Sequence, residues 1–260
     1  MKRRRFYYLI KLQFLGFRYS GWQKQPNQKT IEQMLLKTLK FIIKNGKFKI
    51  LGAGRTDAKV SALDAAFELF TDEPLGELNE FQILFNTNLP PDIRITSISK
   101  TDEYFNIIQS SKVKEYIYLF SFGEKNHPFA APFIANINEM LDLDLMKKAA
   151  KLFEGEHDFS VYTARLQENT KSVRTIESAE IRMNTILEAN FFPKSSYAFH
   201  VKGKGFMRYQ IRMMMGALIQ LGSGELSFSD IEESLKINSE IQLSYVAPGS
   251  GLLLNSLEFE

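Results

Sequence analysis

The first part of the chain alternates between two-residue and helical spacing of its apolar positions. Every second residue from Tyr8 to Phe14 is apolar, which predicts a strand with one buried face. The next stripe has helical spacing, and Thr30 with Gln33 at its start is typical of a capping box. Similar runs continue to residue 98. The expected elements are strand 8–14, helix 31–46, strand 48–51, strand 65–70, helix 79–85 and strand 93–98.

The second part repeats this plan less regularly. Residues Tyr116 to Phe122 are apolar on both faces, so this strand is expected to lie deep inside a sheet. A helix is expected from residue 143 to 153, with Gly155 placed to end it, and a short helix near Ser229, with Glu232 three positions on. The other expected elements are strand 173–183, strand 196–202, helix 207–221 and strand 251–254.

The order strand, helix, strand, strand, helix, strand is the split βαβ plan of a ferredoxin-like unit. No linker rich in glycine, serine or proline separates the two parts. We therefore predict an α+β fold in which two fused ferredoxin-like (split βαβ) units share one antiparallel sheet and enclose a central cleft. The predicted N-terminal half is residues 1–105, and the predicted C-terminal half is residues 106–260.

Composition is that of an ordinary soluble protein, with 44% hydrophobic and 24% charged residues among 260. A net charge of +3 and an isoelectric point near 8.8 favour anionic partners. The basic residues are uneven, because one run spans residues 2–5 and a second cluster follows residue 200. The members of the second cluster are Lys202, Lys204, Arg208 and Arg212. Basic runs are often only solvated faces, so this is a weak nucleic-acid signal.

Several classes of site are excluded or disfavoured. The chain has no cysteine, which excludes disulfides, thiolate nucleophiles and cysteine-ligated zinc. The three histidines lie far apart without metal-ligand spacing, so no metal site is expected. The apolar run after the basic start is interrupted by Lys11, and no run of eighteen apolar residues occurs. We therefore expect no signal peptide, no membrane span and a cytoplasmic location.

The segment Gly52–Ala62 holds the strongest candidate for chemistry. Arg55 lies two residues before Asp57 in a loop of small residues, between two predicted strands. An arginine within a few ångströms would keep the carboxylate ionised, which suits a nucleophile better than a general acid. The alternative is a turn in which the aspartate bonds only its own backbone. The spacing alone leaves both interpretations open.

Two further candidates lie in the second part of the chain. Tyr116 begins a strand directly after a basic, polar stretch, although an aromatic residue on an alternating face is usually part of the core. On the predicted helix 207–221, Arg208, Arg212 and Gly216 fall on one row of spacing four. The arginines could bind phosphate or a carboxylate, and the glycine would admit a close neighbour. The Gly52–Gly54 stretch lacks the lysine of a nucleotide-binding loop.

Seven motifs in the right order resemble the TruA family of tRNA pseudouridine synthases over nearly the whole chain. They include the catalytic-loop motif Gly54–Asp57, the strand motif Glu115–Tyr118 and the helix Phe206–Gly216, in which Arg212 takes the place of the family's arginine. The others are Tyr19–Asn27, Asn86–Ile93, Gly155–Phe159 and the pair Ala247–Pro248 with Gly251–Leu252. The resemblance implies the fused fold, homodimers and tRNA bound across both subunits.

The resemblance also implies a reaction. Uridine would be isomerised to pseudouridine in the anticodon stem-loop, at tRNA positions 38–40, without cofactor or metal. Asp57 would add to the flipped base or to C1′, or act at C2′, and Arg55 would fill the gap in the stem or contact phosphate. Arg212 would pair with Asp57, while Tyr116 would stack on the uracil and move a proton at C5. The residues expected to follow the tRNA backbone are Arg55, Lys24, Lys202, Lys204 and Arg208.

The chain departs from the family pattern at two places. Lys59 and Ser61 stand where glycine and histidine are usual, and the lysine would alter the loop if that position needs a positive φ. Phe105–Ile108 replaces the family's Phe-His-Ala-Arg. These losses keep open a catalytically silent protein that binds or folds RNA. A glycosidase with paired carboxylates is a third reading, which no second acid in a motif supports.

Overall fold

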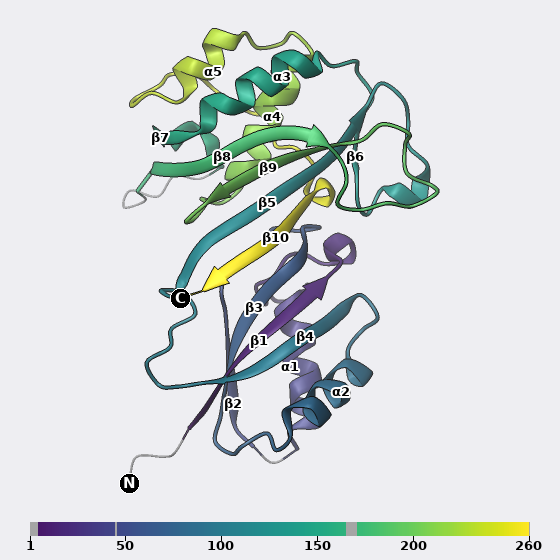
Figure 1. The fold of residues 1–260 in the computed structure, drawn as a ribbon, viewed down its shortest axis with the longest axis vertical. Helices are drawn as coiled ribbons and strands as arrows, with labels where there is room; N and C mark the ends of the chain where they lie inside the picture. Colours follow the sequence, from purple (N-terminus) through teal and green to yellow (C-terminus); the bar gives the residue numbers. More distant parts are fainter. Residues whose placement is uncertain (1–4, 45, 165–170, 260) are drawn as a thin grey trace. The chain divides into compact units, whose positions relative to one another are not determined.

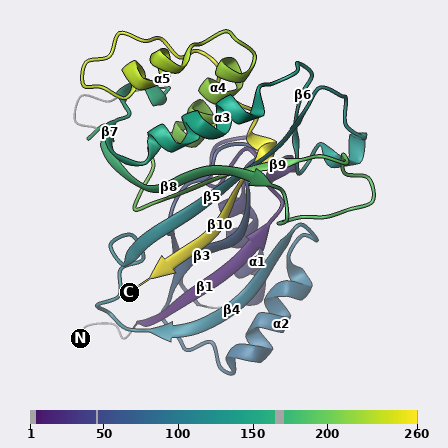
Figure 2. The same ribbon diagram turned by 45° about the horizontal axis from the view of Figure 1, so that its top comes forward.

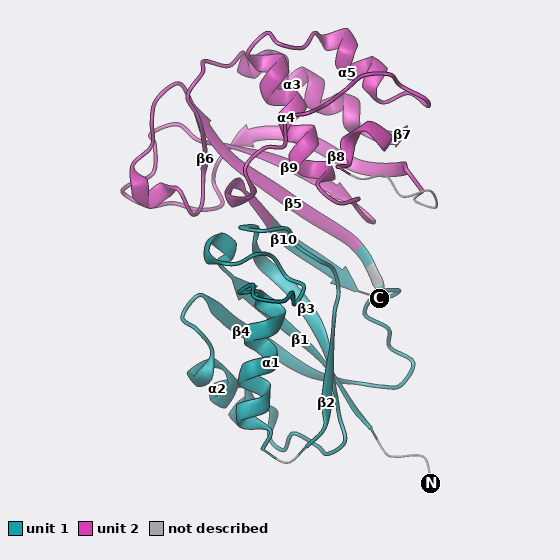
Figure 3. Cartoon of the chain, turned by 180° about the vertical axis from the view of Figure 1, so that it is seen from behind, with its two compact units in different colours: residues 1–112, 254–260 teal, residues 113–253 magenta. Residues whose placement is uncertain are grey.

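The computed structural model describes residues 5–44, 46–164 and 171–259, which divide between two units (Figure 3). Unit 1 comprises residues 1–112 and 254–260, and unit 2 comprises residues 113–253. The last strand of the chain thus lies mostly in unit 1. The division into functional halves at residues 1–105 and 106–260 stays a prediction, and residues 2–4 of the basic run lie outside the described residues.

Unit 1 has the predicted order of strands and helices. Its elements are β1 (Phe6–Phe14), a 3₁₀ turn (Gly16–Arg18), α1 (Ile31–Ile42), β2 (Phe48–Gly52), β3 (Ser61–Thr71), α2 (Leu78–Asn88), β4 (Ile93–Thr101) and β10 (Leu252–Phe259). Strand β1 pairs antiparallel with both β3 and β4, and β2 pairs antiparallel with β3. The helices α1 and α2 lie on the same face of this sheet (Figures 1 and 3).

Burial in unit 1 follows the apolar spacing of its sequence. The alternating residues from Tyr8 to Phe14 are all buried on one face of β1, as predicted. Helix α1 buries Ile31, Leu35 and Leu39 completely. Thr30 caps this helix, because its side-chain oxygen accepts the Gln33 N–H at 3.3 Å. Local sequence signals therefore account for the placement of both elements.

The described residues of unit 2 form a mostly antiparallel sheet and three helices. Its elements are β5 (Ser111–Phe122), β6 (Ala135–Ile137), α3 (Leu143–Ala150), β7 (Gly155–Asp158), β8 (Val173–Met183), β9 (Tyr197–Gly203), α4 (Gln210–Gly222) and α5 (Phe228–Ser234), with 3₁₀ turns at Pro128–Ala130, Lys151–Phe153, Ser160–Tyr162 and Gly249–Gly251. Strands β5, β9, β8 and β7 are neighbours in that order, and β6 runs parallel to β5. Helices α3, α4 and α5 lie together on one side of the unit (Figure 2).

The apolar strand β5 lies inside its sheet, as predicted. The side chains from Ile117 to Phe120 are fully buried, and β9 and β6 border the strand. The mixed α+β content and the mostly antiparallel pairing agree with the expected fold class. The description as two fused ferredoxin-like units with a shared sheet and a cleft stays a prediction.

Two helix starts differ from the prediction. Helix α4 begins at Gln210 and not at Met207, because Tyr209 before it has a φ of 65°, which no helical residue adopts. Arg208 therefore precedes the helix, and the predicted row of spacing four does not include it. Helix α5 is capped by Ser227 and Asp230, which form the capping box expected of Ser229 and Glu232.

Unit 1 also buries a carboxyl group that no sequence pattern singled out. Glu68 on β3 is 1% exposed, and its Oε2 accepts the Ile107 N–H at 3.4 Å. Its Oε1 has no hydrogen-bond partner. Burial raises the pKa of Glu68, since the ionised form loses its hydration. The folded state therefore holds the proton to a higher pH than the unfolded chain does.

This linkage predicts that Glu68→Gln changes how stability depends on pH. As pH rises from the unfolded carboxyl value of about 4.3 through the raised folded pKa, the wild-type protein loses stability. The Glu68→Gln variant cannot ionise, so we expect it to lose less over the same pH range. Urea unfolding from pH 4 to pH 8 measures this, with the exposed Glu80→Gln as control. Equal losses in the wild type and Glu68→Gln would contradict the assignment.

Candidate active site

The Asp57 loop joins β2 to β3 in unit 1 and is held by main-chain hydrogen bonds. The Trp22 N–H donates to the Thr56 carbonyl at 3.0 Å. A turn closes where the Val60 N–H donates to the Asp57 carbonyl at 3.2 Å. The main-chain oxygen of Asp57 closes this turn. Asp57 is half-buried and Arg55 is exposed, so the loop presents a carboxylate and a guanidinium two residues apart.

Lys59 adopts the backbone conformation that the family's glycine suggests. Its φ is 67°, in the left-handed region that side chains disfavour. Its N–H donates to the Tyr19 carbonyl at 3.0 Å, and its Nζ lies 5.6 Å from the centroid of the Phe17 ring. The position thus needs a positive φ, and the lysine meets that need at a cost in conformational energy.

This strain predicts that glycine is more stable than alanine at residue 59 but less stable than alanine at residue 58. Lys59→Gly is expected to be more stable than Lys59→Ala by about 1 kcal/mol, because both lack the lysine side chain and only glycine adopts a positive φ freely. Ala58, the residue before Lys59, has no positive φ, so Ala58→Gly is expected to lower stability. Free energies of unfolding in urea decide this. A Lys59→Ala protein as stable as Lys59→Gly would show that the position carries no strain.

Tyr116 lies on β5 and is half-buried, so it is not a core residue. Its ring and the Phe206 ring form a T-shaped pair with a centroid distance of 5.4 Å and an interplanar angle of 85°. Two residues earlier on the same face, burial lowers the pKa of Lys114. The tyrosine thus has an aromatic support and a partly exposed ring, as a stacking residue needs.

Arg212 is held by the segment that follows α5. Its Nε donates to the Ala247 carbonyl at 2.7 Å, and the Ala247 N–H donates to the Arg212 carbonyl at 3.1 Å. Gly216 allows this approach, because a Cβ there would lie 2.1 Å from the Tyr245 carbonyl oxygen. The expectation that Gly216 admits a close neighbour is therefore met, and the neighbour is the chain itself.

Tyr209 brings the two arginines together. The guanidinium carbons of Arg208 and Arg212 lie 4.8 Å and 4.9 Å from the centroid of its ring. The exposed Arg208 also donates from Nη2 to the Tyr209 hydroxyl at 3.2 Å. Neither Tyr209 nor Phe206 was predicted as a site residue. Both lie in the motif Phe206–Gly216, which was the signal that could have found them.

The predicted lysines occupy two different surroundings. Lys24 and Lys204 are exposed, and the Lys24 N–H donates to Glu32 Oε2 at 2.6 Å. Lys202 is half-buried and lies opposite Glu115 in the β5–β9 register, whereas Tyr116 lies opposite Val201. Because side chains alternate along strands, Lys202 projects from the other face of the sheet than Tyr116 does.

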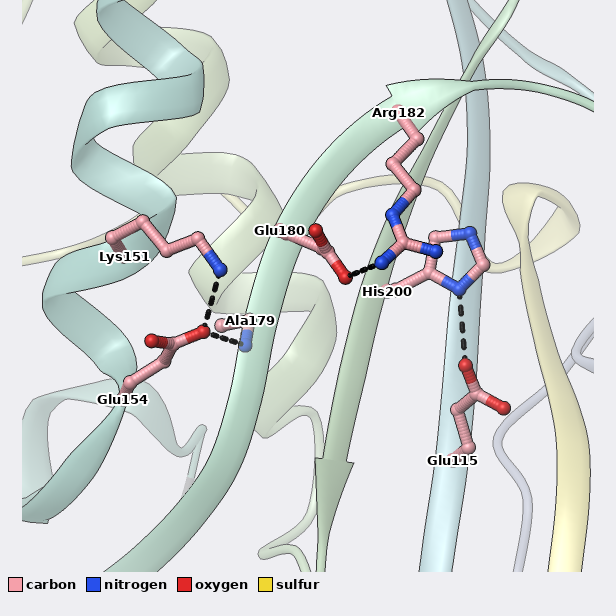
Figure 4. Close-up of polar contacts among 7 residues, drawn as sticks. All are labelled: Glu115, Lys151, Glu154, Ala179, Glu180, Arg182 and His200. Carbon is pink, nitrogen blue, oxygen red and sulfur yellow. Dashed lines mark hydrogen bonds and ion pairs between the residues drawn. The ribbon is translucent and has the colours of Figure 1, made fainter.

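That other face carries paired charges (Figure 4). His200 Nδ1 on β9 lies 3.0 Å from Glu115 Oε1 on β5. Arg182 contacts Glu180, and both lie on β8. A further pair lies between the 3₁₀ turn Lys151–Phe153 and β7, where Glu154 accepts the Lys151 ammonium at 2.8 Å and the Ala179 N–H at 2.9 Å. The charges of this region are thus largely matched within unit 2.

The predicted site residues fall into two groups. Unit 1 supplies Arg55 and Asp57 from one loop, and unit 2 brings Arg208 and Arg212 to one tyrosine ring. The predicted pairing of Arg212 with Asp57 joins the two groups and stays a prediction. Across the described ranges, no group of three or more histidine, aspartate or glutamate side chains could hold a metal ion, and no helix is long and apolar enough to span a membrane.

Comparison with known proteins identifies the family of this chain. A model of the tRNA pseudouridine synthase family matches residues 149–260. The chain is 31% identical over 252 residues to tRNA pseudouridine synthase A 2 of Bacillus thuringiensis subsp. konkukian (strain 97-27), which covers 97% of this chain and 99% of that protein. The tRNA pseudouridine synthase A of Thermodesulfovibrio yellowstonii is 31% identical over 255 residues, with 95% and 97% covered.

A third relative gives the same result. The tRNA pseudouridine synthase A of Oenococcus oeni is 32% identical over 258 residues, with 97% of this chain and 98% of that protein covered. These similarities extend over nearly the full length of each protein, and they agree with the resemblance of the seven motifs. The chain therefore belongs to the tRNA pseudouridine synthase A family.

Proposed function

We propose that this protein isomerises uridine to pseudouridine in tRNA, in the anticodon stem-loop at positions 38–40, without a cofactor. The observation that carries the proposal is the Gly54–Asp57 motif, held between β2 and β3 with Asp57 half-buried. Similarity to tRNA pseudouridine synthases over 97% of the chain supports the substrate class. The isomerisation moves no electrons between molecules, so it requires no redox partner.

The reaction breaks the C1′–N1 bond of the nucleoside and forms a C1′–C5 bond. The uracil leaves C1′, turns and rebonds through C5; the hydrogen on C5 is then lost and N1 gains a proton. The target base must first leave its stack, which costs a few kcal/mol. Asp57 serves as nucleophile or base at C1′, at C2′ or on the ring.

The other site residues position the RNA and Asp57, and transfer a proton. Arg55 fills the gap left by the flipped base or contacts phosphate, and Arg212 pairs with the Asp57 carboxylate. Tyr116 stacks on the uracil, and its hydroxyl moves the proton at C5. The support for this role is its half-buried ring, which forms a T-shaped pair with Phe206.

Cationic side chains follow the tRNA backbone. The exposed Lys24, Lys204 and Arg208 are free of the matched charges that surround Lys202 on its face of the sheet, so they are the stronger candidates. We also propose that the protein acts as a homodimer in the cytoplasm, in keeping with the family that the sequence resembles.

The test uses tRNA tritiated at C5 of uridine, because that hydrogen is released to water when the new bond forms. Purified protein is expected to release tritium from an anticodon stem-loop substrate, in an amount equal to the pseudouridine formed. A transcript with cytidine at positions 38–40 is the control. Tight tRNA binding without release would favour the silent RNA-binding alternative.

A further inference from the structure

The segment Gly16–Trp22, which we call the clamp segment, lies against the Asp57 loop over its whole length. The Gly16 N–H donates to Ser61 Oγ at 2.9 Å, and the Tyr19 carbonyl accepts the Lys59 N–H at 3.0 Å. The Trp22 N–H donates to the Thr56 carbonyl at 3.0 Å. Three bonds therefore hold the loop on both sides of Asp57.

Gly21 makes the closest approach. Its φ is 95°, and a Cβ there would lie 2.5 Å from the Thr56 carbonyl oxygen and 3.1 Å from the Asp57 carbonyl carbon. Such distances are below van der Waals contact with main-chain atoms, which cannot rotate away as a side chain can. Any side chain at residue 21 must therefore push the peptide that carries Asp57.

The clamp segment is itself anchored to the start of β4. The Tyr19 hydroxyl donates to Asp92 Oδ1 at 2.7 Å, and Arg18 Nε donates to Asp92 Oδ2 at 2.8 Å. The Leu15 N–H donates to the Asp92 main-chain carbonyl at 3.0 Å. Tyr19 is 2% exposed, and burial raises its pKa, so the hydroxyl keeps its proton as a donor. Asp92 thus holds the clamp segment through the side chains of Arg18 and Tyr19.

We propose that Gly21 and Tyr19 are positioning residues, which set the place of the Asp57 main chain through the clamp segment. This inference rests on the proposed function, in which Asp57 acts on the nucleoside. A displacement of about 1 Å in a catalytic group can lower turnover about 100-fold while substrate binding is kept. Residues that act only by position are expected to change kcat and leave KM unchanged.

Unit 1 offers a matched control for each residue. Gly76 also has a positive φ, 74°, but a Cβ there would meet nothing within 4 Å. Tyr8 is 1% exposed and its hydroxyl accepts the Leu75 N–H at 3.1 Å, so Tyr8→Phe, like Tyr19→Phe, removes one partly buried hydrogen bond. Gly76→Ala repeats the backbone strain at a positive φ without the collision, and Tyr8→Phe repeats the loss of a hydroxyl hydrogen bond. Neither control touches the Asp57 loop.

The experiment compares Gly21→Ala with Gly76→Ala, and Tyr19→Phe with Tyr8→Phe. Turnover and KM are measured with an anticodon stem-loop tRNA, and melting temperature is measured alongside. We expect kcat to fall about 100-fold in Gly21→Ala and about 10-fold in Tyr19→Phe, with KM within about threefold of the wild type. Both controls are expected to lower the melting temperature and keep their kcat, and Gly76→Ala is expected to lower it less than Gly21→Ala, because a Cβ there meets no main-chain atom.

The single tryptophan supplies an independent signal. Trp22 is 3% exposed, and its indole packs beside Phe14 and over Gly52, where a Cβ would lie 2.6 Å from Nε1. Its fluorescence therefore reports on the packing of the clamp segment where β2 enters the Asp57 loop. We expect its emission to shift to longer wavelength in Gly21→Ala and Tyr19→Phe, and to stay unchanged in the controls. If Gly21→Ala does not fold, the tyrosine pair alone decides.

Three results overturn the inference. If kcat falls in proportion to the loss of melting temperature, and does so alike in all four variants, the segment has only a structural role. If KM rises while kcat is kept, the segment binds RNA. An unchanged Trp22 emission in both Gly21→Ala and Tyr19→Phe would show that the loop does not depend on the segment. If the wild-type protein forms no pseudouridine, the proposed function fails, and the emission still decides whether the segment sets the loop.

Discussion

Replacing Asp57 by asparagine is expected to lower pseudouridine formation in a single turnover by on the order of 10⁴-fold. Asparagine has nearly the same shape but no negative charge, so it can act neither as nucleophile nor as base. The loop is closed by the main-chain carbonyl of Asp57, which the substitution keeps. The fold and the affinity for tRNA are therefore expected to remain.

The measurement uses excess enzyme over tRNA, so that one turnover is followed without product release. The exposed Asp144→Asn on α3 is the control for the same chemical change away from the loop. Melting temperature and tRNA affinity are measured for both variants. Retention of more than a few per cent of wild-type activity by Asp57→Asn would count against the assigned role.

Tyr116→Phe is expected to lower turnover about 100-fold or more, with tRNA binding unchanged. Phenylalanine keeps the ring that forms a T-shaped pair with Phe206 and removes only the hydroxyl. Tyr116→Leu removes the stacking surface as well, so it is expected to lose both turnover and affinity.

Single-turnover assays and tRNA titrations separate these two effects. Tyr197→Phe on the neighbouring strand β9 is the control, because it loses a hydroxyl from another half-buried ring. If Tyr116→Phe is fully active while Tyr116→Leu is inactive, the residue only stacks and the proton-transfer role is wrong.

Local patterns predicted most elements because burial follows the spacing of apolar residues. The alternation from Tyr8 to Phe14 gave β1, and Thr30 marked the start of α1. The start of α5 was two residues out because Ser227 and Ser229 each precede an acidic residue by three positions. The capping-box pattern fits both serines equally well, so it cannot identify which one begins the helix.

The rest depended on contacts that no local pattern contains. Tyr209 adopts a left-handed backbone although tyrosine rarely does, so the start of α4 was not visible in the sequence. Tyr19 and Asp92 are 73 residues apart, and nothing near either one predicts their hydrogen bond. The motifs placed Asp57, Tyr116 and Arg212 as candidates, but their geometry comes only from the fold.

The most direct test of the proposed function is pseudouridine mapping of tRNA from cells. Cells that lack this protein are compared with the same cells that carry the wild-type chain or the Asp57→Asn chain. We expect pseudouridine at tRNA positions 38–40 to be absent without the protein, restored by the wild type and absent with Asp57→Asn. Restoration by Asp57→Asn, or a tRNA pattern that does not change with the wild-type protein, would contradict the proposal.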